Sequence, residues 1–253
     1  MSMKVVDKTN MEDFKKIDVS SWDSLKDHVY VRLINQKFLS KYGDVAHTKL
    51  LDLALTFSVQ EKSKDTLLSH LLTEEELKSF NVQIDEVKQI ALKNTTHDRK
   101  KRIMTFKESI LKDNVMYPVL QVSDGVAIGA HSKTDCGIIQ DIDKDTGADN
   151  VLILCNKYNT FGASYMASFD ILEEIYERFN ENFYIIPLSV HEVMCVRSGY
   201  ASHDGEKPRT EVDDDFLDMI EAFNDNHNKS WKDILSYKIY YYYGDEDKLF
   251  LIK

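Results

Sequence analysis

The chain has 253 residues, of which 43% are hydrophobic and 11% are aromatic. This composition is sufficient for a packed core and excludes an intrinsically disordered chain. The formal net charge is −11, from 43 acidic and 32 basic residues. Such a charge repels nucleic acid phosphates and anionic lipids, which disfavours both as general partners.

The sequence contains no membrane or secretion signal. No apolar run approaches the roughly 20 residues of a membrane-spanning helix, and residues 1–20 are charged throughout. We expect this N-terminal stretch to be flexible or a short helix. The three cysteines, Cys136, Cys155 and Cys195, are far apart and odd in number, which is typical of reduced thiols. The sequence therefore predicts a cytoplasmic protein.

The first half of the chain predicts strands followed by helices. Alternating apolar or β-branched residues indicate half-buried strands, at residues 28–34, 50–60 and 65–72. Thr73 and Glu76 have the spacing of a capping box, which predicts a helix through Phe80. Apolar residues at helical spacing predict two more helices, at residues 83–94 and 101–113.

The second half repeats this order of strands and helices. Apolar runs predict strands, at residues 115–122, 150–156, 161–167 and 237–244, and two more within residues 183–196, joined around Pro187. The pair 151–156 and 161–167 is interpreted as a hairpin, because turn residues separate the two runs. Helical periodicity predicts helices, at residues 170–179 and 211–224.

Strands and helices are grouped in runs, which favours an α+β fold of mostly antiparallel sheets with helices packed on them. The chain has only three prolines and no linker-like stretch, so we expect a single domain over residues 21–253. The similar order of elements leaves an internal duplication open, with halves at 21–113 and 114–253.

Metal and cofactor signatures are weak. Asp141, Asp143 and Asp145 have the spacing of the first ligands of a calcium loop. However, Thr146 stands where such a loop needs glycine, and Leu152 where it needs glutamate, so we expect a turn and no metal. The chain also lacks HExxH, CxxC, GxSxG, P-loop and GxGxxG motifs, and we expect no cofactor.

His191 and Glu192 lie side by side in the apolar stretch 183–196. Neighbouring residues of a strand point to opposite faces, so both can face one pocket only where a turn re-aims them. We predict that Pro187 and Ser189 turn the chain between two antiparallel strands. The ring of His191 then hydrogen-bonds backbone or a neighbouring carboxylate, and Glu192 faces solvent.

Asp52 lies in another apolar run, residues 50–60. A buried carboxylate needs a partner, and we expect His47 or Arg32 to provide one. The alternative is a functional pocket that contains His191, Glu192, Asp52 and His47, in which a histidine beside a carboxylate acts as a general base.

Several stretches together resemble a family of unknown function from bacterial gut anaerobes with an (S/L)SVHEV motif. They include residues 30–35, 46–57, 91–95, 151–166, 185–196 and 239–243. The layout is more distantly similar to the YtpQ-like family. Leu188 stands where the resembling family commonly has serine, and Ala46 where it has proline. The resemblance implies an intracellular bacterial protein and no particular reaction.

Three functions compete. The first is a non-enzymatic interaction or regulatory module that binds another protein, because the chain has 13 tyrosines, including Tyr240–Tyr243. The second is an enzyme or small-ligand binder around His191. The third is nucleic-acid contact through the basic run 99–102, which the net charge opposes. We favour the first function, and the oligomeric state stays open.

Overall fold

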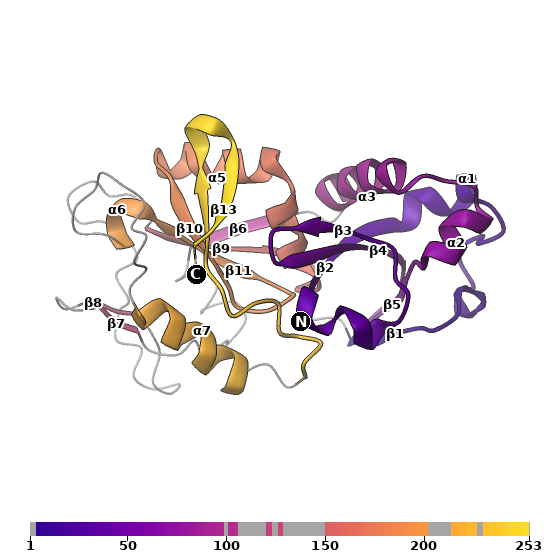
Figure 1. Ribbon diagram of the computed structural model, residues 1–253, viewed down its shortest axis with the longest axis horizontal. Helices are drawn as coiled ribbons and strands as arrows, with labels where there is room; N and C mark the ends of the chain where they lie inside the picture. The colour runs from indigo at the N-terminus through magenta and orange to yellow at the C-terminus, as the bar shows by residue number, and fades with distance from the viewer. Residues whose placement is uncertain are drawn as a thin grey trace.

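The structure, a computed structural model, describes residues 4–98, 101–105, 120–122, 126–128, 150–201, 214–226 and 230–252. Most described strands form two large sheets, with helices packed on both (Figure 1). A separate ribbon pairs β7 (Leu120–Val122) with β8 (Val126–Ile128). The predicted α+β fold with mostly antiparallel sheets is confirmed.

The first sheet has the strand order β1-β5-β4-β2, with β3 beside β4. Its strands are β1 (Lys4–Asp7), β2 (Val29–Asn35), β3 (His47–Leu50), β4 (Leu53–Lys62) and β5 (Thr66–Leu71). Only β1 and β5 run parallel. One face is apolar, whereas alternation along β2 and β4 places polar side chains on the other face. These polar residues are nevertheless buried, and they are Arg32, Thr56, Ser58 and Gln60.

Three helices accompany this sheet, and they are α1 (Trp22–Leu25), α2 (Glu74–Ser79) and α3 (Ile84–Asp98). The predicted capping box of Thr73 and Glu76 is confirmed at the start of α2. Helix α3 covers the edge of β2, because Thr95 Oγ1 accepts a hydrogen bond from the Val31 N–H at 2.9 Å. Asn94 donates to the Val29 carbonyl at 2.9 Å. These side chains satisfy backbone groups that an open sheet edge would leave unpaired.

The second sheet is antiparallel, with the order β13-β12-β10-β11-β9-β6. Its strands are β6 (Lys101–Thr105), β9 (Val151–Asn156), β10 (Phe183–Pro187), β11 (Val193–Arg197), β12 (Tyr240–Tyr243) and β13 (Lys248–Leu251). Helices α5 (Phe169–Phe179) and α7 (Asp214–Asn226) lie on opposite sides of it (Figure 1). The short helix α6 (Ser198–Ala201) follows β11.

Burial on both faces explains the tyrosine run. Tyr240 and Tyr242 pack into the core that contains α5, whereas Tyr241 packs into the cluster that contains α7. All three are at most 3% exposed. These three tyrosines therefore belong to the core, whereas Tyr243 is half-buried and packs against the second cluster.

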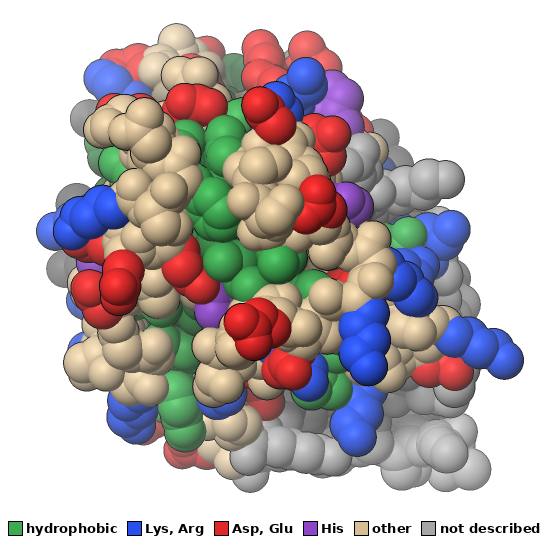
Figure 2. Space-filling view, turned by 90° about the vertical axis from the view of Figure 1, so that its right-hand side faces the viewer, with side chains coloured by type: hydrophobic (Ala, Val, Ile, Leu, Met, Phe, Trp, Pro, Cys, Tyr) green, Lys and Arg blue, Asp and Glu red, His purple; other side chains and the backbone are tan. Residues whose placement is uncertain are grey.

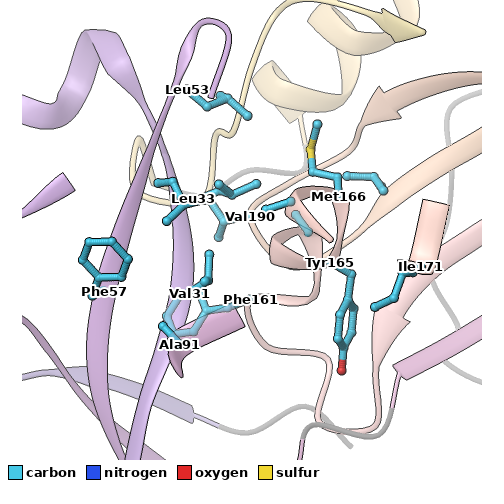
Figure 3. Packing of buried hydrophobic residues seen from close by; sticks show 14 of the residues in the cluster. Val31, Leu33, Leu53, Phe57, Ala91, Phe161, Tyr165, Met166, Ile171 and Val190 are labelled. Atoms are coloured by element: carbon cyan, nitrogen blue, oxygen red, sulfur yellow. The ribbon is translucent and has the colours of Figure 1, made fainter. Parts of the chain in front are cut away.

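The two sheets share one hydrophobic core. Figure 3 shows Val31 and Leu33 of β2 facing Phe161 and Val190 from the second half of the chain. On a different side of the molecule, shown in Figure 2, an apolar band is bordered by interspersed acidic and basic side chains. In this view, Lys and Arg side chains gather toward the lower right, and Asp and Glu side chains lie mainly above and to the left of the band.

Two predicted elements are wrong. Residues 101–105, predicted as part of a helix, form β6, which pairs with β9 and so belongs to the second sheet. The rest of that predicted helix lies outside the described residues. Residues 161–167, predicted as the second strand of a hairpin, form a 3-10 helix, η4 (Gly162–Ala167), with all of its residues buried.

The N-terminal stretch contains a strand, β1, that pairs with β5. A 3-10 turn, η1 (Met11–Asp13), follows, and Phe14 and Ile17 are part of the core. The stretch was expected to be flexible or a short helix, and tertiary pairing explains the difference. Within the described ranges, every helix is too short or too polar to cross a lipid bilayer.

Candidate functional site

The loop 188–192 joins β10 to β11 and carries His191. The Glu192 carbonyl accepts hydrogen bonds from the N–H groups of Leu188, at 3.3 Å, and Ser189, at 3.1 Å. Ser189 Oγ accepts from the His191 N–H at 3.0 Å. The predicted turn between two antiparallel strands is confirmed, and His191 and Glu192 belong to the loop that precedes β11.

The ring of His191 makes a hydrogen bond through one nitrogen and has a carboxylate near the other. Its Nδ1 atom accepts a hydrogen bond from the Phe161 N–H at 3.1 Å. Its Nε2 atom lies 3.6 Å from Asp233 Oδ1, and the Asp233 carbonyl accepts from the Val190 N–H at 2.9 Å. Phe161 has a left-handed backbone, with φ 56°, which is unfavourable for a bulky residue. The hydrogen bond to His191 helps to hold it there.

This geometry limits the chemistry of His191. A neutral imidazole has one lone pair available for accepting a proton. In His191 that lone pair, on Nδ1, accepts the hydrogen bond from Phe161. The other nitrogen then carries the proton and lies 3.6 Å from Asp233 Oδ1, beyond hydrogen-bond distance. Action as a general base would require breaking the contact that holds Phe161, so the arrangement favours an anchoring role.

We expect the substitution His191→Ala to lower the free energy of unfolding by about 1–3 kcal/mol, because the Phe161 N–H loses its acceptor. Glu192→Gln should lower it less than His191→Ala does, since the turn uses the backbone carbonyl of Glu192, which this substitution keeps. Urea unfolding of both variants checks this prediction. Equal, negligible effects would contradict the anchoring role.

Asp52 lies at the turn between β3 and β4 and bridges the two sheets. Its Oδ1 atom accepts from the Tyr240 hydroxyl at 2.6 Å, and its Oδ2 atom accepts from Ser236 Oγ at 3.2 Å. Burial, with the charge of Asp52 and this hydrogen bond, raises the pKa of Tyr240 strongly. The prediction that His47 or Arg32 is the partner of Asp52 is wrong. Asp52 is a structural connection between the sheets.

His47 hydrogen-bonds locally, with Nδ1 2.9 Å from the Val45 carbonyl oxygen. The hydrogen bonds of His47, Asp52 and His191 therefore lead to three separate sets of partners. They do not bring these three residues together as a catalytic group.

Other sequence candidates are only partly described. Asp141, Asp143 and Asp145 lie outside the described residues, and the described part of the chain contains no group of side chains that could hold a metal ion. In the basic run, residues 99 and 100 are also outside the description. Lys101 begins β6 and forms an ion pair with Glu174.

A cluster of aromatic rings was not predicted from the sequence. Phe38 and Tyr42 come from the 3-10 helix η3 (Gln36–Tyr42), and Trp231 comes from a turn near the C-terminus. The ring of Trp231 makes edge contacts with Phe38, at 5.6 Å between centroids, and with Tyr42, at 5.1 Å. All three side chains are half-buried.

Two lysines border these rings. Lys41 Nζ lies 4.8 Å from the centroid of Phe38 and 4.7 Å from that of Trp231. Lys232 Nζ lies 5.9 Å from the centroids of both Tyr42 and Trp231. Such distances permit cation–π attraction. We call Phe38, Tyr42, Trp231, Lys41 and Lys232 the aromatic site.

The buried side chain of Arg32 lies next to the aromatic site. Its guanidinium carbon lies 4.3 Å from the ring centroid of Phe161 and 5.6 Å from that of Tyr42. Its side chain is only 3% exposed, and Nη1 donates to Asp7 Oδ1 at 2.8 Å. The other oxygen of Asp7 lies 3.0 Å from Lys232 Nζ. The carboxylate of Asp7 therefore forms ion pairs with both Arg32 and Lys232.

Burial opposes ionisation of Asp7, but the charges and hydrogen bonds of Arg32 and Lys232 outweigh it and lower the pKa of Asp7. The sequence contains one local signal for this arrangement, because Arg32 interrupts the apolar strand of residues 29–35. It contains no signal for the contact of Arg32 with Phe161 or for the contact of Tyr42 with Trp231, because both partners are far away along the chain.

Comparison with known proteins identifies the family. The model of a family of unknown function (DUF5688) matches residues 2–243. The chain therefore belongs to this family, which confirms the predicted membership in a family of unknown function. No curated protein and no solved structure matches the chain.

Proposed function

We propose that this member of the DUF5688 family is a protein-interaction module that binds an acidic segment of another protein at the aromatic site. The single observation that carries the proposal is the half-buried Trp231, in contact with Phe38 and Tyr42 and bordered by two lysines. Tryptophan, tyrosine and arginine are enriched among the residues that dominate binding energy at protein interfaces.

Charge favours an acidic partner. The chain carries a net charge of −11, so a local group of three cations, Lys41, Lys232 and Arg32, stands out. Lys41 is exposed and forms no ion pair within the described part of the chain. An incoming carboxylate would neutralise it, and an apolar neighbour of that carboxylate would cover the rings. An oligonucleotide also offers anions and planar groups. It carries a phosphate at every nucleotide, so the net charge of −11 opposes it more strongly than a short segment with one or two carboxylates.

The geometry of His191 supports binding over catalysis. Its lone pair holds Phe161, and Phe161 in turn lies against Arg32. His191 therefore holds Phe161 in position, and Phe161 packs against Arg32 next to the aromatic site.

Selection from a displayed library of random peptides on the immobilised protein tests the proposal. We expect enriched peptides to carry aspartate or glutamate beside an apolar residue. Trp231→Ala should weaken their binding by about 2 kcal/mol, which is roughly thirtyfold. Lys41→Glu should weaken it as well, because the new carboxylate repels the peptide.

Lys248→Glu is the matched control, since it makes the same charge change on β13 of the second sheet. It should retain binding within about twofold, the effect of a distant surface charge. Enriched peptides that bind Trp231→Ala as tightly as the wild type would contradict the proposal. An enriched set without acidic residues, or preferential binding of oligonucleotides, would contradict it too.

A further inference from the structure

We propose that the partner's acidic segment seats one side-chain carboxylate between Arg32 and Lys232, in the place that Asp7 occupies, so that Asp7 is an internal competitor for the partner. This inference rests on the proposed function and specifies the chemical group that is recognised.

The first support is the unsatisfied guanidinium. Arg32 Nε is buried and has no hydrogen-bond partner among the described residues. A guanidinium has five N–H donors, and its planar edge pairs best with a carboxylate through two parallel hydrogen bonds. Asp7 takes a hydrogen bond from Nη1. The rings of Tyr42 and Phe161 flank the guanidinium and fix its orientation for a carboxylate that replaces Asp7.

The second support is the ratio of charges. Asp7 faces both Arg32 and Lys232, with N···O distances of 2.8 Å and 3.0 Å. Both cations therefore depend on the one carboxylate of Asp7 for their ion pairs, although the charge of Asp233 also acts on the neighbouring Tyr42. Both cations also lie near the ring of Tyr42, so a carboxylate in this place is next to the aromatic site.

The third support is the position of Asp7 at the end of a short edge strand. It is the last residue of β1, a four-residue strand at the edge of the first sheet. Within the described residues, β1 pairs only with β5, and its side chains are exposed or half-buried. Short edge segments with little apolar burial open at low free-energy cost. An acidic segment can therefore replace Asp7 without unfolding the core.

Rescue by acetate tests the site without any partner. Asp7→Ala removes the carboxylate and leaves Arg32 and Lys232 facing the vacated space. We expect acetate, compared with chloride at equal ionic strength, to raise the Tm of this variant by about 2–4 °C, because a ligand of the folded state stabilises it. The wild type should show no difference between the two salts.

Two variants serve as controls. Asp13→Ala removes a neighbouring carboxylate that pairs with Lys8 on the surface at 3.3 Å, and acetate should not rescue it. The double variant Arg32→Met, Asp7→Ala lacks the guanidinium and should lose the acetate effect. Equal Tm values of Asp7→Ala in acetate and chloride would overturn the inference.

If Asp7→Ala does not fold, Asp7→Asn provides a second test. Its amide oxygen still accepts a hydrogen bond from Arg32, so we expect this variant to fold. A weaker internal competitor should raise the affinity for the selected acidic peptides, by about tenfold. Unchanged or lower affinity would overturn the inference. Because acetate rescue needs neither Trp231 nor a peptide, its failure alongside Trp231-dependent peptide binding would leave the proposed function intact.

Discussion

Gly162→Ala is expected to lower the free energy of unfolding by about 3 kcal/mol, the upper part of the usual range for overpacking a core. A Cβ atom at this position would lie 2.5 Å from the His191 carbonyl oxygen. It would also lie 2.8 Å from the Asn156 backbone nitrogen and 2.8 Å from Cys155 Cα. All three atoms belong to the backbone of buried or half-buried elements, so none can move aside as a flexible side chain would.

The measurement is chemical unfolding of Gly162→Ala beside the control Gly199→Ala. At Gly199 the nearest atom to an added Cβ is the Glu181 carboxylate oxygen, at 3.1 Å, which is the end of a flexible side chain. We expect Gly199→Ala to change stability by less than about 1 kcal/mol. If the two variants were equally stable, the close approach of β9, η4 and the His191 loop would be disproved.

The second large effect concerns the buried pair of His70 and Glu76. His70 Nε2 lies 2.8 Å from Glu76 Oε1, and Nδ1 lies 3.1 Å from the Lys8 carbonyl oxygen. Both ring nitrogens face acceptors, so the charged imidazolium fits best. Burial works against that charge, but the hydrogen bond and charge of Glu76 outweigh it and raise the pKa of His70.

Glu76 shifts in the opposite direction. Burial works against its charge, but the hydrogen bond of His70 and the N–H of Thr73 outweigh it and lower the pKa of Glu76. The stabilisation from Glu76 is complete above its ordinary pKa of 4.5 and is lost as the pH falls through the lowered value. The stabilisation from His70 is complete below its ordinary pKa of 6.5 and is lost as the pH rises through the raised value.

We therefore expect the pair to stabilise the fold most between pH 4.5 and 6.5. In this window, Glu76→Gln should cost about 3 kcal/mol, because it leaves the charge of His70 buried without its counter-charge. Free energies of unfolding measured across pH check the prediction, and the variant should lack the stability maximum between pH 4.5 and 6.5. Lys78→Gln, which breaks an exposed pair with Glu74 at 3.8 Å, should leave the profile unchanged. A profile of Glu76→Gln parallel to that of the wild type would rule out this coupling.

Local signals predicted much of the fold. The capping box at Thr73 and the periodicity of α5 depend on residues within a few positions of one another, and both elements form where expected. The turn before His191 also follows from nearby residues. These features need no knowledge of the rest of the chain.

The wrong predictions depend on distant contacts. Ile103 is compatible with helical spacing, yet it pairs with Leu154 of β9, and strand pairing determines the outcome. Residues 161–167 look like a strand, but Gly162 approaches the His191 loop so closely that the chain forms a 3-10 helix there. Hydrophobic periodicity cannot predict either contact, because the two partners of each are separated by tens of residues.

The aromatic site was beyond prediction for the same reason. Trp231 meets Phe38 and Tyr42 only after the C-terminal segment returns to the first sheet. The tyrosine run is the opposite case, in which a predicted surface is buried. Four consecutive aromatics indicate a surface in the sequence, but α7 covers the second face of the sheet and buries Tyr241.

One NMR experiment tests the central claim most directly. The chain has two tryptophans, Trp22 and Trp231, so its spectrum contains two indole N–H signals. Trp22 Nε1 donates to Glu86 beside α1, at 3.1 Å, and serves as an internal reference. On addition of a selected acidic peptide, we predict that the Trp231 signal shifts with saturation while the Trp22 signal stays in place. If the Trp231 signal did not move, or if both signals moved alike, the aromatic site would not be where this protein binds its partner.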